Sequence, residues 1–214
     1  MRQAVLFDLD GTITDPGLGF ARCLQHALDA MGLDRVPTER LRRLIGPPFQ
    51  SSLPTIGVPP ERIDEAISLY RAEYEKGGLF EAALYDGIVA SIESLAGAGF
   101  RIALATSKPT RPAERILRHF GVHGHFAFVG GATPDGSRVH KHDVIAHVLE
   151  ELGPSVAVMV GDRRYDVEGA RRCGLPSIAV HWGYADPGEL DACGPDARVD
   201  HPSEIADAVA QLVR

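Results

Sequence analysis

Cysteine is scarce in this chain, and its pattern argues against two classes of small domain. The 214 residues include three cysteines, Cys23, Cys173 and Cys193, which lie far apart and form no Cys-x-x-Cys spacing. A disulfide framework needs paired cysteines and a structural zinc site needs closely spaced ligands, so the sequence favours neither. We therefore expect a protein of a reducing compartment, the cytoplasm.

Long hydrophobic runs are also missing. The first apolar stretch, residues 4–7, stops at Asp8, and no later run reaches the length that a helix needs to cross a bilayer. The first stretch is also too short for the apolar region of a signal peptide. We expect a soluble chain that spans no membrane.

Positive charge is not in excess. Lys and Arg total 22 against 29 Asp and Glu, which gives a formal net charge of -7, and the basic residues are scattered or in short pairs such as Arg42-Arg43. Such a chain has no general attraction for nucleic acid or anionic membranes, although a local site can still bind a small anion. We expect neither of those partners. The length suits one large domain, or a domain that carries a smaller insertion.

Short apolar runs bounded by turn residues recur along the chain and are typical of buried parallel strands. They cover residues 4–7, 102–105, 126–129, 156–160 and 177–180, with a very short sixth candidate at 197–199. Segments with helical spacing lie between most of them, at 88–98, 112–120, 142–152 and 166–173. A last helix is expected from Ser203, a typical capping residue. This alternation predicts an α/β fold with a doubly wound, Rossmann-like parallel sheet.

The alternation fails between residues 15 and 84, where helical patterns occur without a convincing strand. These patterns lie at 19–31, 38–45 and 60–76. The borders hold the turn sequences Asp15-Pro16-Gly17 and Tyr85-Asp86-Gly87, which suit hinges. We therefore predict an α/β core of residues 1–14 and 85–214, and a helical cap of residues 15–84 that acts as a lid over the carboxyl end of the first strand.

The first strand runs directly into a pair of carboxylates. Asp8 and Asp10 are two residues apart and are followed by Gly11 and Thr12. Ligands of open parallel sheets bind outside the carboxyl ends of the strands, so both side chains can face one pocket there. An Asp-x-Asp-Gly turn could also only cap the chain reversal or bind calcium. Its place at a strand end favours chemistry.

Three later places add hydroxyl, ammonium and carboxylate groups. Thr106 follows the second strand, Lys141 precedes an amphipathic segment, and Asp162 and Asp166 follow the fourth strand. Taken singly, Thr106 and Asp166 could be helix caps and Lys141 a solvated lysine. Taken together, they supply what phosphoryl transfer needs: a nucleophile, a proton donor, oxygen ligands for magnesium, and groups that neutralise the transferred phosphoryl.

The order of these motifs resembles that of haloacid dehalogenase-type phosphatases, and the match spans nearly the whole chain. The matching residues are Asp8-x-Asp10-Gly11-Thr12, then Thr106, then Lys141, then Gly161-Asp162-x-x-x-Asp166. The resemblance implies that Asp8 attacks phosphorus, and that Asp10 protonates the leaving oxygen and later activates water. It also implies that Thr106 and Lys141 hold the phosphoryl oxygens.

The resemblance further implies Mg²⁺ as the cofactor. Its ligands would be the side chains of Asp8 and Asp162 and the backbone carbonyl of Asp10, with Asp166 supporting the metal or its water. Ser107 would add a backbone contact to the phosphate. One departure from the family is that Lys141 is followed by histidine, where proline is common. Asp10 must act as acid and base, which suits a pKa raised by neighbouring carboxylates and predicts an alkaline fall in the pH–rate profile.

Several stretches narrow the resemblance to one branch. Residues 10–17, 45–48, 105–109 and 180–184 look like those of phosphoglycolate phosphatases and related 5'-nucleotidases, and the insertion resembles the alpha-helical cap of that branch. The substrate would be a small phosphorylated metabolite, phosphoglycolate first and a nucleoside monophosphate as the alternative. Arg43 and the turn Gly46-Pro47-Pro48 are candidates for contact with the leaving group, or else an exposed arginine and an interhelical turn.

Other functions of the same core remain as alternatives. A dehalogenase would not need Asp10, and a phosphonate hydrolase would need a cap lysine, for which Lys76 is the only candidate. A hexose-phosphate mutase stays open, because it differs only in holding the phosphoenzyme until a sugar phosphate returns. A binding module without turnover is disfavoured, since every catalytic position is filled. We expect a monomer or homodimer.

Overall fold

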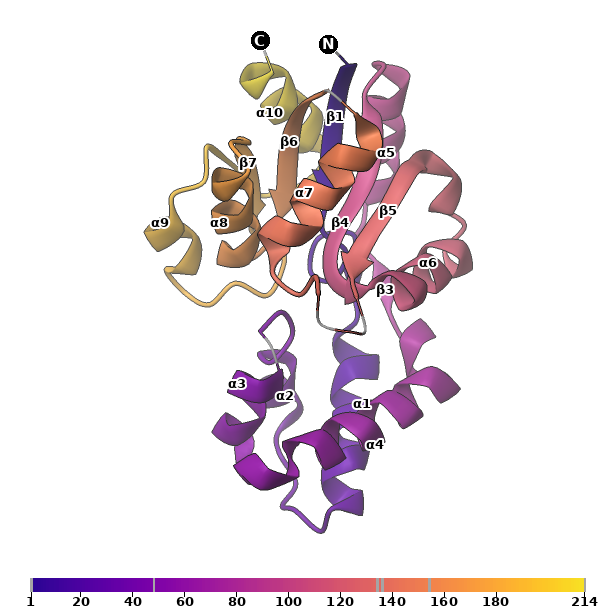
Figure 1. Cartoon of the computed structure of the whole chain (residues 1–214), viewed down its shortest axis with the longest axis vertical. Helices are drawn as coiled ribbons and strands as arrows, with labels where there is room; N and C mark the ends of the chain where they lie inside the picture. The colour runs from indigo at the N-terminus through magenta and orange to yellow at the C-terminus, as the bar shows by residue number, and fades with distance from the viewer. Residues whose placement is uncertain (1, 48, 134, 136, 154, 214) are drawn as a thin grey trace. The chain divides into compact units, whose positions relative to one another are not determined.

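The chain folds into two compact units (Figure 1). The computed structural model describes residues 2–213 except 48, 134, 136 and 154. One unit consists of residues 1–14 and 84–214, and the other of residues 15–83. These units differ from the predicted core and cap by one residue, Leu84.

The larger unit contains a six-stranded parallel sheet in the order β5-β4-β1-β6-β7-β8. Its strands are β1 (Arg2–Phe7), β4 (Arg101–Pro109), β5 (Phe126–Ala132), β6 (Ser155–Gly161), β7 (Ser177–Val180) and β8 (Ala197–Val199). The chain begins in the middle of the sheet, builds outward through β4 and β5, and then returns to the other side of β1. The predicted doubly wound α/β fold is confirmed. The reversal beside β1 creates the crevice where such sheets bind ligands.

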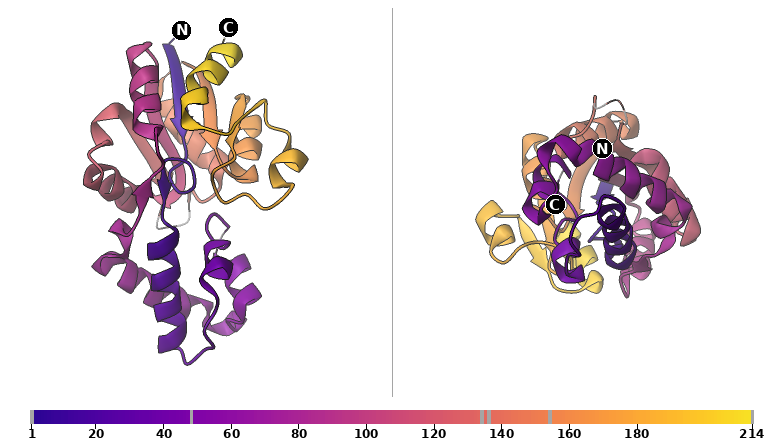
Figure 2. Two further views of the ribbon diagram at one scale, coloured as in Figure 1. Left: turned by 180° about the vertical axis from the view of Figure 1, so that it is seen from behind. Right: turned by 90° about the horizontal axis from the view of Figure 1, so that it is seen from below.

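Helices cover both faces of the sheet (Figures 1 and 2). On one face lie α7 (Lys141–Leu152) and α8 (Arg164–Arg172), and on the other lie α5 (Ile88–Gly97) and α10 (Ile205–Leu212). The side chains of Ala4 and Leu6 pack with Val144 and Val148 of α7, and all four are fully buried. Because β1 is covered on both sides, its sequence is a continuous apolar run and does not alternate.

The remaining elements of the larger unit are short, apart from one ten-residue helix. They are α6 (Thr110–His119), η4 (His123–His125), α9 (Glu189–Cys193) and η5 (Pro202–Glu204). Two of them correct the sequence-based expectations. The helix α9 was not predicted. Ser203 does not cap α10 but lies inside η5, which His201 caps, since the ring of His201 accepts a hydrogen bond from the backbone of Ser203.

The smaller unit is helical. It contains α1 (Gly17–Ala30), α2 (Thr38–Arg42), α3 (Phe49–Ser52), η1 (Leu53–Ile56), η2 (Pro60–Arg62), α4 (Ile63–Lys76) and η3 (Gly78–Phe80). The helix α1 packs against α4 through an aromatic cluster, in which Phe20 and Tyr70 have ring centroids 5.4 Å apart. Three of these helices match the predicted ones within a few residues, and α3 was not predicted.

The chain crosses between the units through two short strands, β2 (Thr14–Asp15) and β3 (Ala83–Leu84), which pair with each other. Two residues are too few to leave a periodic pattern in a sequence. Among the described residues, no helix has the length and apolar character that crossing a membrane requires.

Candidate functional site

The turn after β1 presents Asp8 and Asp10 at the carboxyl edge of the sheet. The backbone of Asp8 still donates to Val160 of the neighbouring strand at 2.9 Å, and the chain then reverses as Ile13 and Thr14 donate to the carbonyl of Leu9. Gly11 has φ 86°, and a β-carbon there would lie 2.2 Å from a carboxylate oxygen of Asp162. Only glycine allows the turn to lie this close to Asp162, so Gly11 of the motif is required by the packing of the site.

Lys141 joins two of the carboxylates. It is the first residue of α7 and is 6% exposed, so it is not the solvated lysine that the sequence left open. Its Nζ lies 2.9 Å from Oδ1 of Asp8 and 2.7 Å from Oδ1 of Asp166, and it donates to the carbonyl of Ala105 at 3.0 Å. Burial alone would lower the pKa of Lys141, but Asp166 and Asp8 outweigh it and the net pKa is raised. The ammonium therefore stays charged.

Asp162 and Asp166 complete a buried acidic cluster. Asp162 follows β6 and is fully buried, and Asp166 lies in the first turn of α8 with 2% exposure. One oxygen from each of Asp8, Asp162 and Asp166 lies within 4.8 Å of the others. Burial, together with the charges of Asp166 and Asp8, raises the pKa of Asp162 well above its usual value. Burial, opposed by Lys141, raises the pKa of Asp166 to about 6.

The charge of the cluster suits a divalent cation. Four carboxylates, including Asp10, lie against two ammonium groups, so the fully ionised site has an excess of two negative charges. Carboxylate oxygens are the ligands that Mg²⁺ prefers in proteins. The raised pKa values of Asp162 and Asp166 show how costly these charges are without a cation. The residues therefore fit Mg²⁺.

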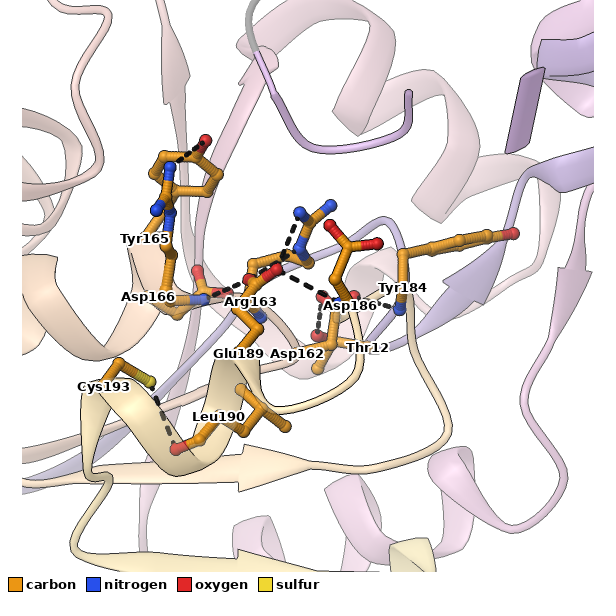
Figure 3. A network of polar contacts seen from close by, with 11 residues as sticks. Thr12, Asp162, Arg163, Tyr165, Asp166, Tyr184, Asp186, Glu189, Leu190 and Cys193 are labelled. Atoms are coloured by element: carbon orange, nitrogen blue, oxygen red, sulfur yellow. Dashed lines mark hydrogen bonds and ion pairs between the residues drawn. The ribbon is translucent and has the colours of Figure 1, made fainter. Parts of the chain in front are cut away.

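Two groups that the sequence did not identify hold Asp162 (Figure 3). The hydroxyl of Thr12 donates to Oδ1 at 3.2 Å, and the backbone amide of Tyr184 donates to Oδ2 at 2.7 Å. Trp182 in turn donates from its ring nitrogen to the carbonyl of Thr12 at 3.1 Å. Thr12 was part of the quoted motif but had no role assigned. Residues 180–184 were noted only for their likeness to one branch; a backbone amide carries no residue identity, so the contact of Tyr184 with Asp162 could not be predicted from them.

Lys108 is a further residue that the sequence reasoning missed. Its Nζ lies 2.7 Å from Oδ2 of Asp10, and its side chain is 10% exposed. The other carboxylate oxygen of Asp10 is buried, and no described residue donates a hydrogen bond to it. Burial raises the pKa of Asp10, Lys108 opposes this, and Asp8 adds to it. The expected direction is found, but burial and not the neighbouring carboxylates is its main cause. Lys108 lies two residues after Thr106, but nothing in the sequence indicates that its side chain reaches Asp10.

Thr106 lies at the same edge of the sheet. The pairing of β1 and β4 sets Phe7 beside Leu104, so Asp8, which follows β1, and Thr106, which lies within β4, are at the same edge of the sheet. Thr106 is 2% exposed and its hydroxyl accepts from the backbone of Lys108 at 3.2 Å. It is not a helix cap, because β4 continues irregularly to Pro109 before α6 begins. Ser107 is exposed.

Arg43 belongs to the other unit. It is exposed and follows directly after α2, while its neighbour Arg42 pairs with Asp15 at 3.1 Å. Of the turn Gly46-Pro47-Pro48, the last residue lies outside the described residues. A contact between Arg43 and a leaving group stays a prediction.

The sequence and the fold of the chain are similar to those of known proteins. A model of the family described as haloacid dehalogenase-like hydrolase matches residues 5–180. The chain is 43% identical over 191 residues to the tyrosine-protein kinase PtkA of Mycobacterium tuberculosis, a match covering 88% of this chain and 65% of PtkA. The chain thus spans less than two thirds of that relative. The solved structure of PtkA matches with a TM-score of 0.86 and 40% identity, over 97% of this chain and 98% of that one.

Two further relatives have other names. A 5'-nucleotidase of Pseudomonas aeruginosa is 41% identical over 194 residues, with 89% of this chain and 88% of the relative covered. A phosphoglycolate phosphatase of Aquifex aeolicus is 27% identical over 205 residues, with 95% and 94% covered. All three names describe enzymes that transfer or hydrolyse a phosphoryl group. The names differ in the substrate and in the phosphoryl acceptor.

Proposed function

The chain belongs to the haloacid dehalogenase-like hydrolase family, and we propose that it is a magnesium-dependent phosphoric monoester hydrolase acting through an aspartyl-phosphate on Asp8. One observation carries the proposal. The carboxylate of Asp8 lies at the switch point of the sheet, against the ammonium of Lys141 and within the acidic cluster of Asp162 and Asp166. A nucleophile, a fixed positive charge and oxygen ligands for a cation thus meet at one strand end.

In the first half of the reaction, a carboxylate oxygen of Asp8 attacks phosphorus and the bond to the leaving oxygen breaks. Lys141 neutralises charge on the transferred phosphoryl, and Thr106 donates a hydrogen bond to one of its oxygens. Asp10 gives its proton to the leaving oxygen. A carboxyl whose pKa is raised by burial suits this donor role.

In the second half, the Asp10 carboxylate accepts a proton from water, whose oxygen attacks phosphorus and releases Asp8 and inorganic phosphate. Lys108, 2.7 Å from Asp10, stabilises this carboxylate form. Burial favours the acid and Lys108 favours the base, so the two influences let one residue serve both steps.

Mg²⁺ would be held by the side chains of Asp8 and Asp162 and the backbone carbonyl of Asp10, with Asp166 beside them. When bound, it supplies charge neutralisation for the phosphoryl group and fixes its orientation. Lys141 holds Asp8 and Asp166 in place through its two ion pairs.

The proposed substrate is a small phosphomonoester. The resemblance in sequence pointed first to phosphoglycolate, but the relative named 5'-nucleotidase is 41% identical while the one named phosphoglycolate phosphatase is 27% identical. We therefore propose nucleoside 5'-monophosphates and phosphoglycolate as equally strong candidate substrates. We propose residues 15–84 as the cap that selects between them, with Arg43 as a candidate contact.

Transfer to a protein tyrosine is a second candidate, because the relative named tyrosine-protein kinase is 43% identical over 191 residues. The two candidates share Asp8 and its surroundings and differ in the acceptor, which is water for a hydrolase and a tyrosine hydroxyl for a kinase. Incubation with ATP and a tyrosine-containing polypeptide, followed by detection of phosphotyrosine, separates them.

The deciding experiment compares wild type with Asp8→Asn, with and without Mg²⁺, on nucleoside monophosphates, phosphoglycolate and sugar phosphates. We expect phosphate release that needs both Asp8 and Mg²⁺, and a hydroxylamine-sensitive phosphoenzyme during turnover. The substitution should lower kcat by at least roughly 10⁴-fold, the scale of losing a nucleophile. Asp34→Asn, at an exposed aspartate, is the control and should match wild type.

Turnover that survives Asp8→Asn would rule out the aspartyl-phosphate. Phosphotyrosine formation without phosphate release would favour the kinase. A phosphoenzyme that persists until a sugar phosphate is added would favour a mutase.

A further inference from the structure

A buried ion pair lies beside the acidic cluster and is not used by the reaction described above. Arg163 follows Asp162 directly, and its Nε and Nη2 donate to the two carboxylate oxygens of Glu189 at 2.9 and 3.0 Å (Figure 3). The side chains are 6% and 9% exposed. Two parallel bonds to one carboxylate fix both distance and orientation.

Glu189 binds more than the arginine. It is the first residue of α9, and its carboxylate also accepts from the backbone amides of Arg164 at 2.8 Å and Asp186 at 3.2 Å. One side chain thus joins the start of α8, the start of α9 and the loop of residues 181–188. Arg163 and Glu189 are 26 residues apart in the chain, and no bond of a helix or a sheet joins them.

The two joined segments also hold the carboxylates of the acidic cluster. The backbone amide of Arg163 donates to Oδ2 of Asp166 at 3.0 Å, and the amide of Tyr184, from the loop, donates to Oδ2 of Asp162 at 2.7 Å. The loop is tightly placed, because a β-carbon on Gly183 would lie 2.2 Å from the β-carbon of Asp162. A shift of either segment would therefore move a carboxylate.

We propose that Arg163 and Glu189 are positioning residues: their ion pair holds the loop of residues 181–188 against the start of α8 and so keeps Asp162 and Asp166 arranged for Mg²⁺. Neither residue is proposed to touch metal or substrate. The buried carboxylates repel one another and would separate if the backbone allowed it. This inference rests on the proposed function for the identity of the cation. Groups of this kind outside the ligand set commonly affect metal affinity by roughly 10–100-fold.

The test measures Mg²⁺ binding directly, by calorimetry on the full chain without substrate, and by the Mg²⁺ concentration that gives half of the maximal rise in Tm. We expect Glu189→Gln, which removes the charge and keeps the shape, to weaken Mg²⁺ binding by roughly 10–100-fold. Arg163→Lys, which keeps the charge but loses the paired bonds, should give a smaller loss. With saturating Mg²⁺, the KM for substrate should stay at the wild-type value and kcat should largely recover.

A matched control lies on the same helix. Asp191 of α9 pairs with Arg198 at 3.2 Å, but its side chain is 80% exposed and neither residue binds the segments that hold the cluster. Asp191→Asn should leave Mg²⁺ affinity unchanged. Circular dichroism establishes that each variant is folded, and Arg163→Lys decides the matter if Glu189→Gln does not fold.

The outcomes separate this inference from the proposed function. If wild type binds Mg²⁺ and the folded variants bind it equally well, the positioning role is overturned and the phosphatase proposal stands. Equal weakening by Asp191→Asn would also overturn it, because the effect would then follow the general stability of α9. If wild type itself binds no Mg²⁺, the proposed function fails, and this inference with it.

Discussion

Two opposing effects act on the pKa of Asp10. Burial favours its protonated form, while the ammonium of Lys108 at 2.7 Å favours the carboxylate. A general acid and base works best when neither form is strongly preferred. Removal of the Lys108 ammonium should therefore change the rates of the two halves of the reaction by different factors.

We predict that Lys108→Met slows hydrolysis of the phosphoenzyme more than it slows formation of the phosphoenzyme. Without the ammonium, Asp10 stays protonated, so it can still donate a proton but is less able to accept one from water. We expect kcat to fall on the order of tenfold, the effect of one pKa unit on the available base, and the phosphoenzyme to accumulate. Rapid-quench measurement of both steps checks this.

The control for that substitution is Lys76→Met, which removes an exposed lysine of α4 whose side chain is 70% exposed. It should leave both steps unchanged. An unchanged level of phosphoenzyme in Lys108→Met, or an equal slowing of both steps, would contradict the role given to Lys108.

For single residues, the sequence predicted the site residues at strand ends. It missed those that reach the site through an irregular strand or a backbone group. Asp8, Asp162 and Thr106 could be chosen because parallel strands end at one edge. The contact of Lys108 with Asp10 depends on the irregular end of β4, which has no pattern in the sequence. The amide of Tyr184 is a backbone group, and its neighbours could not reveal that it binds Asp162.

Among the elements, α1 and η3 of the smaller unit approach each other closely. A β-carbon on Gly19 would lie 2.4 Å from the carbonyl oxygen of Gly78 and 2.8 Å from that of Glu81. The backbone of Gly19 also donates to Glu81 at 3.1 Å. The helix can lie this close to η3 only because Gly19 has no side chain.

We predict that Gly19→Ala destabilises the smaller unit by about 1–3 kcal/mol, the usual cost of forcing an extra carbon into a packed contact. Gly97→Ala, in α5, is the matched control, because no atom lies within 4 Å of the added carbon there. Alanine should raise stability at that position by up to about 1 kcal/mol, through its higher helix propensity. Urea unfolding of both variants measures the difference, and equal effects would refute the close-packing explanation.

Element prediction succeeded where burial leaves a pattern. The strands of the core are covered on both faces, so their apolar runs stood out, and the amphipathic helices between them did as well. Short elements were missed because their form depends on distant partners. The helix α9 has five residues, and its first residue, Glu189, binds Arg163 at a distance of 26 residues in sequence.

At the scale of the whole molecule, the acidic cluster connects metal binding to folding. Asp166 has a pKa of about 6 in the folded, metal-free protein, against 3.8 as its ordinary value. A carboxyl with a raised pKa binds its proton more tightly in the folded state. Its contribution to stability is therefore complete below about pH 4 and is lost as the pH rises to about 6.

We predict that, in the presence of a chelator, wild type loses stability relative to Asp166→Asn as the pH is raised from about 4 to about 6.5. The loss should be a few kcal/mol, since about two pKa units separate the folded and unfolded states. Asparagine does not titrate, so the variant lacks this contribution, and it also loses the part of the raised pKa of Asp162 that comes from the charge of Asp166. Urea unfolding at a series of pH values measures the difference.

Mg²⁺ should reverse the effect, because a bound cation stabilises the ionised carboxylates and the free energy of binding adds to that of folding. Wild type with excess Mg²⁺ should therefore gain stability relative to its chelated form as the pH rises through 6, and Asp166→Asn should gain less. A difference between chelated wild type and variant that does not change with pH would show that Asp166 is already ionised without metal. The pKa of Asp166 would then not be raised, and the cluster would carry its full negative charge without a divalent cation.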